Sequence, residues 1–185
     1  YTGGFDRHRG LDIAIKAISI VKNRIPNIKL QLVGGGMNED ELKEFVNRLQ
    51  LEDYVDFEGY QPHNHLVSYI KASDICIIPH IKTQHTDNTI PHKLFQYMIM
   101  EKPVIASDCN PIKRIVNSTN CGLIYESGNH EMLAQCMINL VGKDHEEYTK
   151  SGKKAVLEHF NWEKTSKGLI KLYGDAKQPE ISIPD

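Results

Sequence analysis

Two stretches of the sequence combine residue types that suit the binding of a phosphate group. The first, TGGFDRHRGLD, places two glycines ahead of Arg9 and Gly10, where a helical pattern of apolar residues begins. Glycines let a ligand approach the backbone closely, and a helix N-terminus beside a guanidinium attracts an anion. A tight turn with a solvent-exposed arginine is the alternative interpretation.

The second stretch, HTDNTIPHKLFQYM, predicts the start of another helix. Residues 87–89 are all of the types that cap helices, and Pro91 is favoured at the first helical position, so we expect the helix to begin at about residue 90. Its free N–H groups and positive dipole end, with Lys93 in the first turn, would form an anion site. Leu94 can face the core, whereas Gln96 lies off that apolar stripe. The alternative is an ordinary, well-capped helix.

Two further loops carry weaker signals. In FEGYQPHNHL, Tyr60 could stack on a nucleotide base while free backbone groups read the edge of that base; a solvent-exposed aromatic residue is the alternative. In LVGGGMNEDEL no G-x-G-x-x-G dinucleotide fingerprint is completed, and the pair Asn38 and Glu41 indicates a helix capping box.

The remaining polar residues indicate neither a metal site nor a catalytic nucleophile. The histidines near these loops match no metal-binding spacing, and no Ser/His/Asp or Cys/His arrangement is identifiable; these histidines are His63, His65, His80, His85 and His92. The four cysteines form no C-x-x-C pair, which is typical of reduced, mostly buried thiols in a cytoplasmic protein.

Composition and charge indicate an ordinary globular protein. The 185 residues suit one domain. The net charge of −2 comes from 22 basic and 24 acidic residues that are well mixed along the chain, which argues against nucleic acid as the main partner. No apolar run approaches the roughly 20 residues that span a bilayer.

The elements that must position these loops alternate along the chain. Apolar runs predict strands in the opening YTGG and at residues 28–34, 54–59, 74–79, 102–107 and 121–126, with amphipathic segments between several of them and three helices after residue 130. This alternation predicts an α/β fold, a Rossmann-like doubly wound parallel sheet of about six strands with C-terminal helices. Ligands would bind beyond the carboxyl ends of the strands. We expect one domain over residues 1–176 and a tail at 177–185.

The motifs follow one another in a specific order over residues 1–175. GGFDRHRGLD is followed by LVGGG, VDFEGY, ASDICIIP, IPHKLFQYM, KPVIASD, KRIV, CGLIYE and the closing FNWEKTSKGLIKLY. This order resembles the C-terminal, donor-binding half of family-4-type retaining glycosyltransferases, which have the two-domain GT-B architecture.

The resemblance implies roles for individual residues. Arg9 matches a basic residue that contacts the donor diphosphate, whereas Gly4 stands where the family usually has a second arginine. Tyr60 and Gln61 match the base-recognition loop. The family's Glu-x7-Glu element, whose carboxylates hold donor-sugar and ribose hydroxyls, falls on Asn88 through Gln96, so both carboxylates are replaced by amides, which lack the charge of a carboxylate contact. The implied donor-binding residues are Gly4, Arg9, Tyr60, Gln61, Asn88, Thr89, Lys93, Leu94 and Gln96.

The resemblance also implies a function. A hexosyltransferase of this type moves a sugar from a UDP- or GDP-type donor to an acceptor alcohol with retention, in surface glycan synthesis, without a cofactor or an obligatory metal. The implied partners are the nucleotide sugar, an acceptor glycan or lipid-linked glycan, and an N-terminal Rossmann-like domain of the same protein. That domain would carry the acceptor site and any catalytic base, so the isolated chain would be inactive. The implied location is the cytoplasm, with peripheral contact at the inner membrane surface as an option.

Two other functions stay open. The loss of both acidic positions favours a non-catalytic nucleotide-sugar-binding module. A sugar-nucleotide epimerase or a phosphorylase on the same architecture is a further alternative, although the loops carry no conspicuous carboxylate or cofactor-binding lysine signature.

Overall fold

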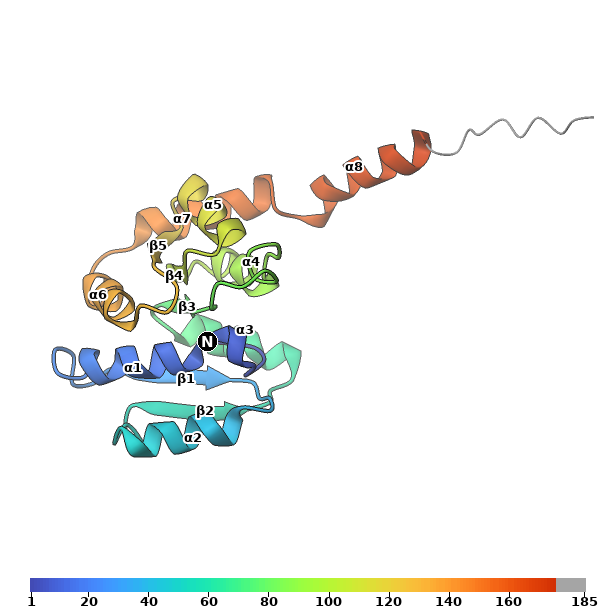
Figure 1. Cartoon of the computed structure of the whole chain (residues 1–185). Helices are drawn as coiled ribbons and strands as arrows, with labels where there is room; N and C mark the ends of the chain where they lie inside the picture. The colour runs from blue at the N-terminus through green and yellow to red at the C-terminus, as the bar shows by residue number, and fades with distance from the viewer. Residues whose placement is uncertain (176–185) are drawn as a thin grey trace, which may run out of the picture.

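The structure of the protein is a computed structural model that describes residues 1–175. Helices and short strands alternate as far as β5, and three helices complete the described chain (Figure 1). The elements are η1 (Arg7–Arg9), α1 (Leu11–Val21), β1 (Leu30–Val33), α2 (Glu39–Arg48), β2 (Val55–Gly59), α3 (His63–Ala72), β3 (Cys76–Ile78), α4 (His92–Ile99), β4 (Val104–Ser107), α5 (Asn110–Thr119), β5 (Gly122–Tyr125), α6 (His130–Leu140), α7 (Glu146–Glu158) and α8 (Trp162–Asp175).

All strand pairings are parallel, which confirms the expected α/β fold. β1 pairs with β2, and β4 lies between β3 and β5. The opening residues add a single parallel bridge, between Thr2 and Val33. The expected strand in YTGG is therefore absent, and residues 1–175 contain five strands in two sheets, close to the expected number of about six. Residues 1–3 do bond to β1, but over too few residues to form a strand.

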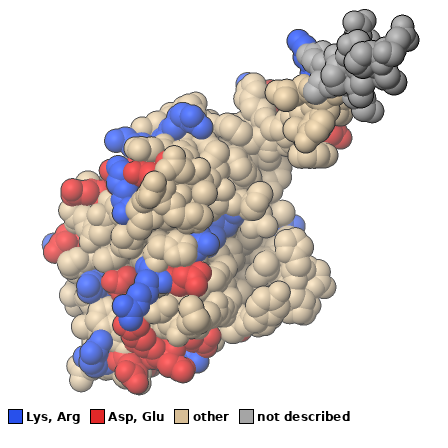
Figure 2. Space-filling view, turned by 45° about the vertical axis from the view of Figure 1, so that its right-hand side comes forward, with Lys and Arg blue, Asp and Glu red and all other residues tan. Residues whose placement is uncertain are grey.

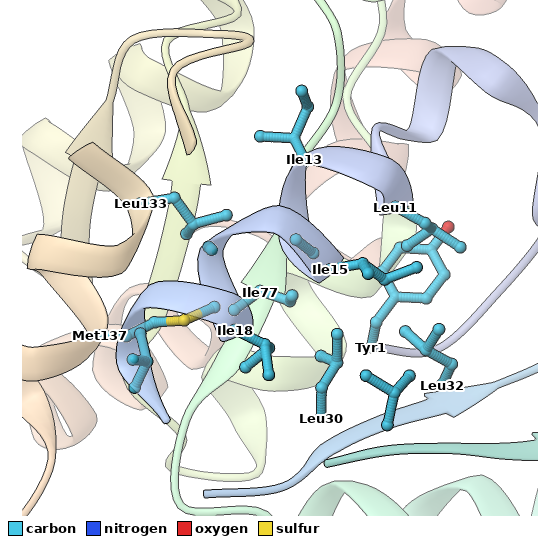
Figure 3. Packing of buried hydrophobic residues seen from close by; sticks show 14 of the residues in the cluster. Tyr1, Leu11, Ile13, Ile15, Ile18, Leu30, Leu32, Ile77, Leu133 and Met137 are labelled. Carbon is cyan, nitrogen blue, oxygen red and sulfur yellow. The ribbon is translucent and has the colours of Figure 1, made fainter. Parts of the chain in front are cut away.

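Side chains of the central strands point alternately to two faces, and both faces are covered by helices. Ile77 of β3 belongs to a core that includes α1 and α6, whereas the next residue, Ile78, belongs to a core that includes α4, α5 and α7. Figure 3 shows the first core, in which isoleucines of α1 lie between the strands and Leu133 and Met137 of α6. Burial on both faces explains why these strands read as unbroken apolar runs.

The three helices expected after residue 130 are α6, α7 and α8. α6 packs against α1 and α7 against α4, while α8 projects away from the rest of the fold (Figure 1). α8 exposes large apolar side chains, among them Trp162 and Tyr173. The predicted tail at 177–185 lies outside the described residues. On the face seen in Figure 2, acidic and basic side chains are interspersed rather than gathered by sign.

Two local features differ from the sequence expectations. α5 was not predicted, although Ile112, Ile115 and Val116 recur at helical spacing and Pro111 stands in its first turn. The expected capping box at α2 is wrong. Asn38 precedes the helix but makes no side-chain cap, because its φ of −95° and ψ of 8° depart from the extended N-cap geometry; its amide bonds to the Glu41 carboxylate at 3.0 Å instead.

Candidate anion-binding site

The loops that follow the strands are joined into one continuous rim at the carboxyl edge of the fold. The Gly3 N–H donates to Val33 O at 2.8 Å, and the Gly34 N–H donates to Gly59 O at 2.8 Å. The Ile81 N–H donates to His8 O at 2.9 Å, which ties the loop after β3 to η1. Loops from distant parts of the sequence therefore hold one another in place.

Gly10 is required where η1 meets the loop after β3. Its φ is +65°, and a Cβ added there would lie 1.9 Å from Pro79 O. Only glycine adopts this left-handed conformation at no cost and leaves room for the carbonyl. This contact sets the position of Arg9 relative to His80, the residue that follows Pro79.

Arg9 lies at the end of η1 with its side chain half-buried. Its Nη1 is 3.3 Å from His80 Nε2, and its Nε is 3.9 Å from an Asp6 carboxylate oxygen. Arg9 Nε is buried and has no hydrogen-bond partner among the described residues. The guanidinium is thus held next to His80, while its Nε–H makes no hydrogen bond within the described residues.

Lys93 reaches the same place from the first turn of α4. Its Nζ lies 3.6 Å from the centre of the Tyr1 ring, and the Tyr1 hydroxyl donates to Gly4 O at 2.7 Å. Lys93 Nζ is buried without a hydrogen-bond partner in the part of the chain that the structure describes. Gly4, Arg9 and Lys93, which the sequence analysis selected from two separate motifs, are therefore brought together.

Three basic groups of this site have lowered pKa values. Burial, aided by the charges of Lys93 and Arg9, lowers the pKa of His80 to about 3. Burial and the charge of Arg9 also lower the pKa of His8 and hold that of Lys93 well below its usual range. Burial is the largest cause of each of these pKa shifts and the neighbouring basic groups add to it, so a bound anion would oppose the shifts.

The start of α4 differs from the expectation of a helix capped by residues 87–89. The helix begins at His92, and its N-cap is Pro91, in an extended conformation without a side-chain cap. The side chains of Asn88 and Thr89 donate instead to Gln84 O at 2.6 Å and His85 O at 2.9 Å. The residue before a proline is disfavoured in the helical region, so the turn that precedes Pro91 stays separate from α4.

Further along α4 the side chains divide between core and rim. Leu94 is fully buried in the core and its N–H donates to Pro91 O at 3.1 Å, and its place among the donor-binding residues stays a prediction. Gln96 is half-buried and makes no side-chain hydrogen bond within residues 1–175. Tyr97, which the sequence analysis did not select, is buried and its hydroxyl contacts Thr2, at 3.0 Å from the N–H and 3.1 Å from Oγ1.

The loop after β2 is the most open part of the rim. Tyr60 is 90% exposed. Gln61 is half-buried and its side-chain Nε2 donates to Glu58 O at 2.7 Å, which leaves its Oε1 available. In the loop predicted to recognise a base, Tyr60 is therefore an exposed aromatic side chain next to the hydrogen-bonded amide of Gln61.

A second group of residues fixes the loop after β3, and the sequence analysis did not identify it. The Asp108 carboxylate accepts from the Ser127 N–H at 2.9 Å and from Lys82 Nζ at 3.4 Å. Ser127 Oγ donates to His80 O at 3.2 Å. The position of Asp108 directly after β4 is the sequence signal that could have suggested this role, because such residues lie at the carboxyl edge of the sheet.

Comparison with known proteins identifies the family. The family model described as "Glycosyl transferases group 1" matches residues 1–158. The chain belongs to this family. A member from Erwinia amylovora, the amylovoran biosynthesis glycosyltransferase AmsK, is 27% identical over 133 residues, which cover 71% of this chain and 33% of the relative. The chain spans between a third and a half of the length of the curated relatives it matches.

Solved structures of GT-B glycosyltransferases share the fold. The sucrose-phosphate synthase of Thermosynechococcus elongatus superposes with a TM-score of 0.79 at 26% identity, over 94% of this chain and 44% of that one. HepE of Anabaena, solved in complex with UDP-glucose, superposes with a TM-score of 0.81 at 18% identity, over 94% of this chain and 47% of that one.

None of the helices within residues 1–175 has the length and apolar content that crossing a membrane takes. In the same residues, no three His, Cys, Asp or Glu side chains gather closely enough to hold a metal ion.

Proposed function

We propose that this chain is the donor-binding half of a family-4-type retaining glycosyltransferase that uses a UDP- or GDP-sugar. One observation carries the proposal. Among residues 1–175, four buried side-chain nitrogen or oxygen atoms have no hydrogen-bond partner, and three of them are nitrogens of His8, Arg9 and Lys93. Buried polar groups are normally paired, so the unpaired donors of Arg9 and Lys93, with the unpaired His8 nitrogen beside a helix N-terminus, favour an anionic ligand such as a diphosphate.

The chemistry that this arrangement suits is departure of a nucleoside diphosphate. When the bond between the sugar and the diphosphate breaks, negative charge develops on the leaving phosphate oxygens. Arg9, Lys93 and the first N–H groups of α4 would stabilise that charge, which lowers the barrier without requiring a metal ion for the purpose. Transfer of the sugar to an acceptor alcohol, with retention, would follow.

The relatives support a role in glycan synthesis. AmsK is named for amylovoran biosynthesis, and HepE was solved with UDP-glucose. Because the chain spans less than half of these proteins, we propose that the acceptor site and the catalytic base belong to an N-terminal domain, and that the acceptor is a glycan or a lipid-linked glycan. The chain alone would then bind donor but transfer no sugar.

The first test is calorimetric titration of the folded chain with UDP, GDP, ADP and CMP side by side. We expect saturable binding of one nucleoside diphosphate, and at least tenfold weaker binding to Arg9→Ala, since a hydrogen bond to a charged group contributes about 1.5–3 kcal/mol. The matching nucleoside should bind both proteins alike. Equal weakening of nucleoside and diphosphate would remove Arg9 from the phosphate role.

A second candidate function is a binding module that holds a nucleotide sugar without transferring the sugar. The amides Asn88 and Gln96 favour it, because neither supplies the charged hydrogen bond that a carboxylate would give to a sugar or ribose hydroxyl. Donor binding by the full-length protein, without release of nucleoside diphosphate in the presence of acceptors, would support this candidate over the transferase.

A further inference from the structure

A pocket of about 380 Å³ lies between η1, α1 and α2, and no residue assigned to donor binding lines it. Its volume falls within the roughly 300–1,000 Å³ that is usual for small-molecule sites. It takes side chains from the loop before η1, from the first half of α1 and from α2, and we call it the α1–α2 pocket. The chemistry of its lining residues indicates which ligand it suits.

The floor of the α1–α2 pocket is apolar. Phe5 and Leu42 are buried, and Phe45 is half-buried. Two cations approach the Phe45 ring: Lys16 Nζ lies 5.7 Å and the Arg48 guanidinium carbon 5.4 Å from its centre. Because cation–π contacts are weak where solvent reaches them, these side chains can give way to an apolar ligand surface that packs on the ring.

The charged groups of the α1–α2 pocket balance one another. Its lining includes three carboxylates and three cations, namely Asp6, Asp12, Glu41, Arg7, Lys16 and Arg48. An anion would lie close to carboxylates and a cation close to other cations, so neither meets a surplus of the opposite charge. A neutral ligand that is rich in hydroxyl groups meets no such repulsion.

The polar side chains also have the right shape for pairs of hydroxyl groups. A carboxylate presents two acceptors, a guanidinium presents a fork of donors, and the amide of Asn38, which also lines the pocket, presents both. A saccharide ring has neighbouring hydroxyl groups at its edge and C–H groups on its face. The polar side chains and the apolar floor therefore match the two parts of a saccharide ring.

The existing contacts among these polar side chains are weak enough for a ligand to replace them. Arg7 and Glu41 form an ion pair at 3.2 Å, although their side chains are 82% and 62% exposed. Lys16 Nζ is 3.9 Å from an Asp12 carboxylate oxygen. Because exposed ion pairs contribute little to stability, hydroxyl groups of a ligand can bind these side chains without a large loss elsewhere.

Asp6 joins the α1–α2 pocket to the anion site. It lines the pocket, and one of its carboxylate oxygens lies 3.9 Å from Arg9 Nε. Resting on the proposed function, we propose that the pocket is a subsite for a neutral saccharide unit of the acceptor glycan. The unit held here is not the one that receives the sugar. It anchors the acceptor on this half, next to the diphosphate, while the reacting unit contacts the N-terminal domain.

The first experiment adds the neutral disaccharides cellobiose, lactose and maltose to the isotope-labelled chain and follows its backbone amide NMR signals. Glucuronic acid and glucosamine serve as charged comparisons. We expect saturable, millimolar binding of at least one disaccharide, with the largest shifts at pocket residues such as Arg7, Asp12 and Glu41, and weaker binding of the charged sugars. Shifts centred on the Tyr60 loop, or no binding at tens of millimolar, would show that the proposal is wrong.

Two glutamates of α2 provide a matched pair of variants. Glu41 lines the pocket, whereas Glu44 is exposed on the same helix and does not. Glu41→Ala should weaken disaccharide binding by about threefold or more, because a hydrogen bond to a charged group is lost, while Glu44→Ala should bind like the parent. Both variants should melt close to the parent temperature, since exposed ion pairs contribute little. Equal affinities in the two variants would overturn the proposal.

A second titration asks whether the saccharide belongs to the acceptor or to the donor. The disaccharide is added in the presence of saturating UDP-glucose or GDP-glucose, whichever matches the diphosphate that calorimetry selects. We expect unchanged or tighter disaccharide binding, because an acceptor and a donor occupy the enzyme together. Competition between the two ligands would mean that the pocket holds the donor sugar, and the acceptor role would be wrong.

The outcomes also distinguish this proposal from the proposed function. Binding of a nucleoside diphosphate without binding of any disaccharide would overturn the role of the α1–α2 pocket alone. Disaccharide binding that depends on Glu41, without binding of UDP, GDP, ADP or CMP, would overturn the nucleotide-sugar function alone. Binding of neither kind of ligand by the folded parent would overturn both.

Discussion

The residues selected for phosphate binding and those selected for the base and the ribose are held in place differently. On the side of Arg9 and Lys93, buried donors, a required glycine and hydrogen bonds between loops define the position of each group before any ligand arrives. Tyr60 and Gln96, which the sequence predicts to contact the base and the ribose, lack such support: the Tyr60 side chain is 90% exposed and the Gln96 side chain makes no hydrogen bond within residues 1–175. The difference indicates that the residues proposed to bind phosphate are positioned before a ligand arrives, whereas those proposed to contact the base and the ribose are free to adjust.

The largest expected effect compares two glycines with the same backbone conformation. Gly10 and Gly59 both have a φ of +65°, but a Cβ would lie 1.9 Å from Pro79 O at Gly10 and would meet nothing within 4 Å at Gly59. Gly59→Ala should cost about 1–2 kcal/mol of unfolding free energy from the left-handed conformation alone. Gly10→Ala should cost more than about 3 kcal/mol or prevent folding. Urea unfolding measures both losses of free energy. Equal losses would mean that the close approach of Pro79 O to Gly10 adds no constraint.

The next effect is a dependence of stability on pH that originates at His80. Its pKa is about 3 in the folded chain against an ordinary value of 6.5, so the unfolded chain binds the proton first as the pH falls. Stability from this group is therefore present above pH 6.5 and is lost between pH 6.5 and 3, with a slope of up to about 1.4 kcal/mol per pH unit.

Urea unfolding at pH 7, 6 and 5 tests the role of His80. The parent chain should lose stability more steeply than His80→Gln, which keeps a side chain able to accept from Arg9. If stability depended on pH equally in the two proteins, protonation of His80 would not be what destabilises the fold.

A smaller effect is expected at Tyr60. If a base stacks on its ring, Tyr60→Ala should weaken binding of the nucleoside and of the nucleoside diphosphate equally, by roughly 1–3 kcal/mol, whereas Tyr60→Phe should bind like the parent. Calorimetry with both ligands measures the two losses. Unchanged affinity in Tyr60→Ala would leave this residue as an exposed side chain without a ligand.

The smallest effect is expected at Gln96. Gln96→Glu restores a charged acceptor for a ribose hydroxyl, and charge-assisted hydrogen bonds are roughly twice as strong as neutral ones, so we expect nucleotide affinity to be kept or to rise by a few-fold. Gln135→Glu, on an exposed side chain of α6, is the matched control. A loss of affinity in Gln96→Glu but not in the control would indicate that the side chain at position 96 lies near phosphate rather than ribose.

The fold could be predicted because its signals are local. Apolar runs and helical periodicity located β1 to β5 and α6 to α8, and strand alternation follows from burial on both faces. The prediction of the opening strand failed for the opposite reason, since three residues provide no pattern and their backbone–backbone hydrogen bonds all go to β1.

The candidate site was predictable in its membership more than in its geometry. Arg9 and Lys93 were selected from local motifs, but their unpaired nitrogens result from packing against His80 and Tyr1, which no local pattern encodes. Asn88 and Thr89 have the composition of helix caps, yet each bonds within its own turn, because Pro91 separates that turn from α4. Asp108 was missed because its partners, Lys82 and Ser127, lie on other loops.

The hydroxyl of Tyr97 carries one further consequence. It fastens α4 to Thr2 through two contacts, while the hydroxyl of Tyr1 fastens Gly4 over Lys93. Residues 1–4 and α4, which line the proposed anion site, are therefore linked by hydrogen bonds that oppose their separation. A ligand of the proposed site would approach it from the solvent side at Gly3 and Gly4, both of which are exposed, so its dissociation rate would depend on what covers these two residues.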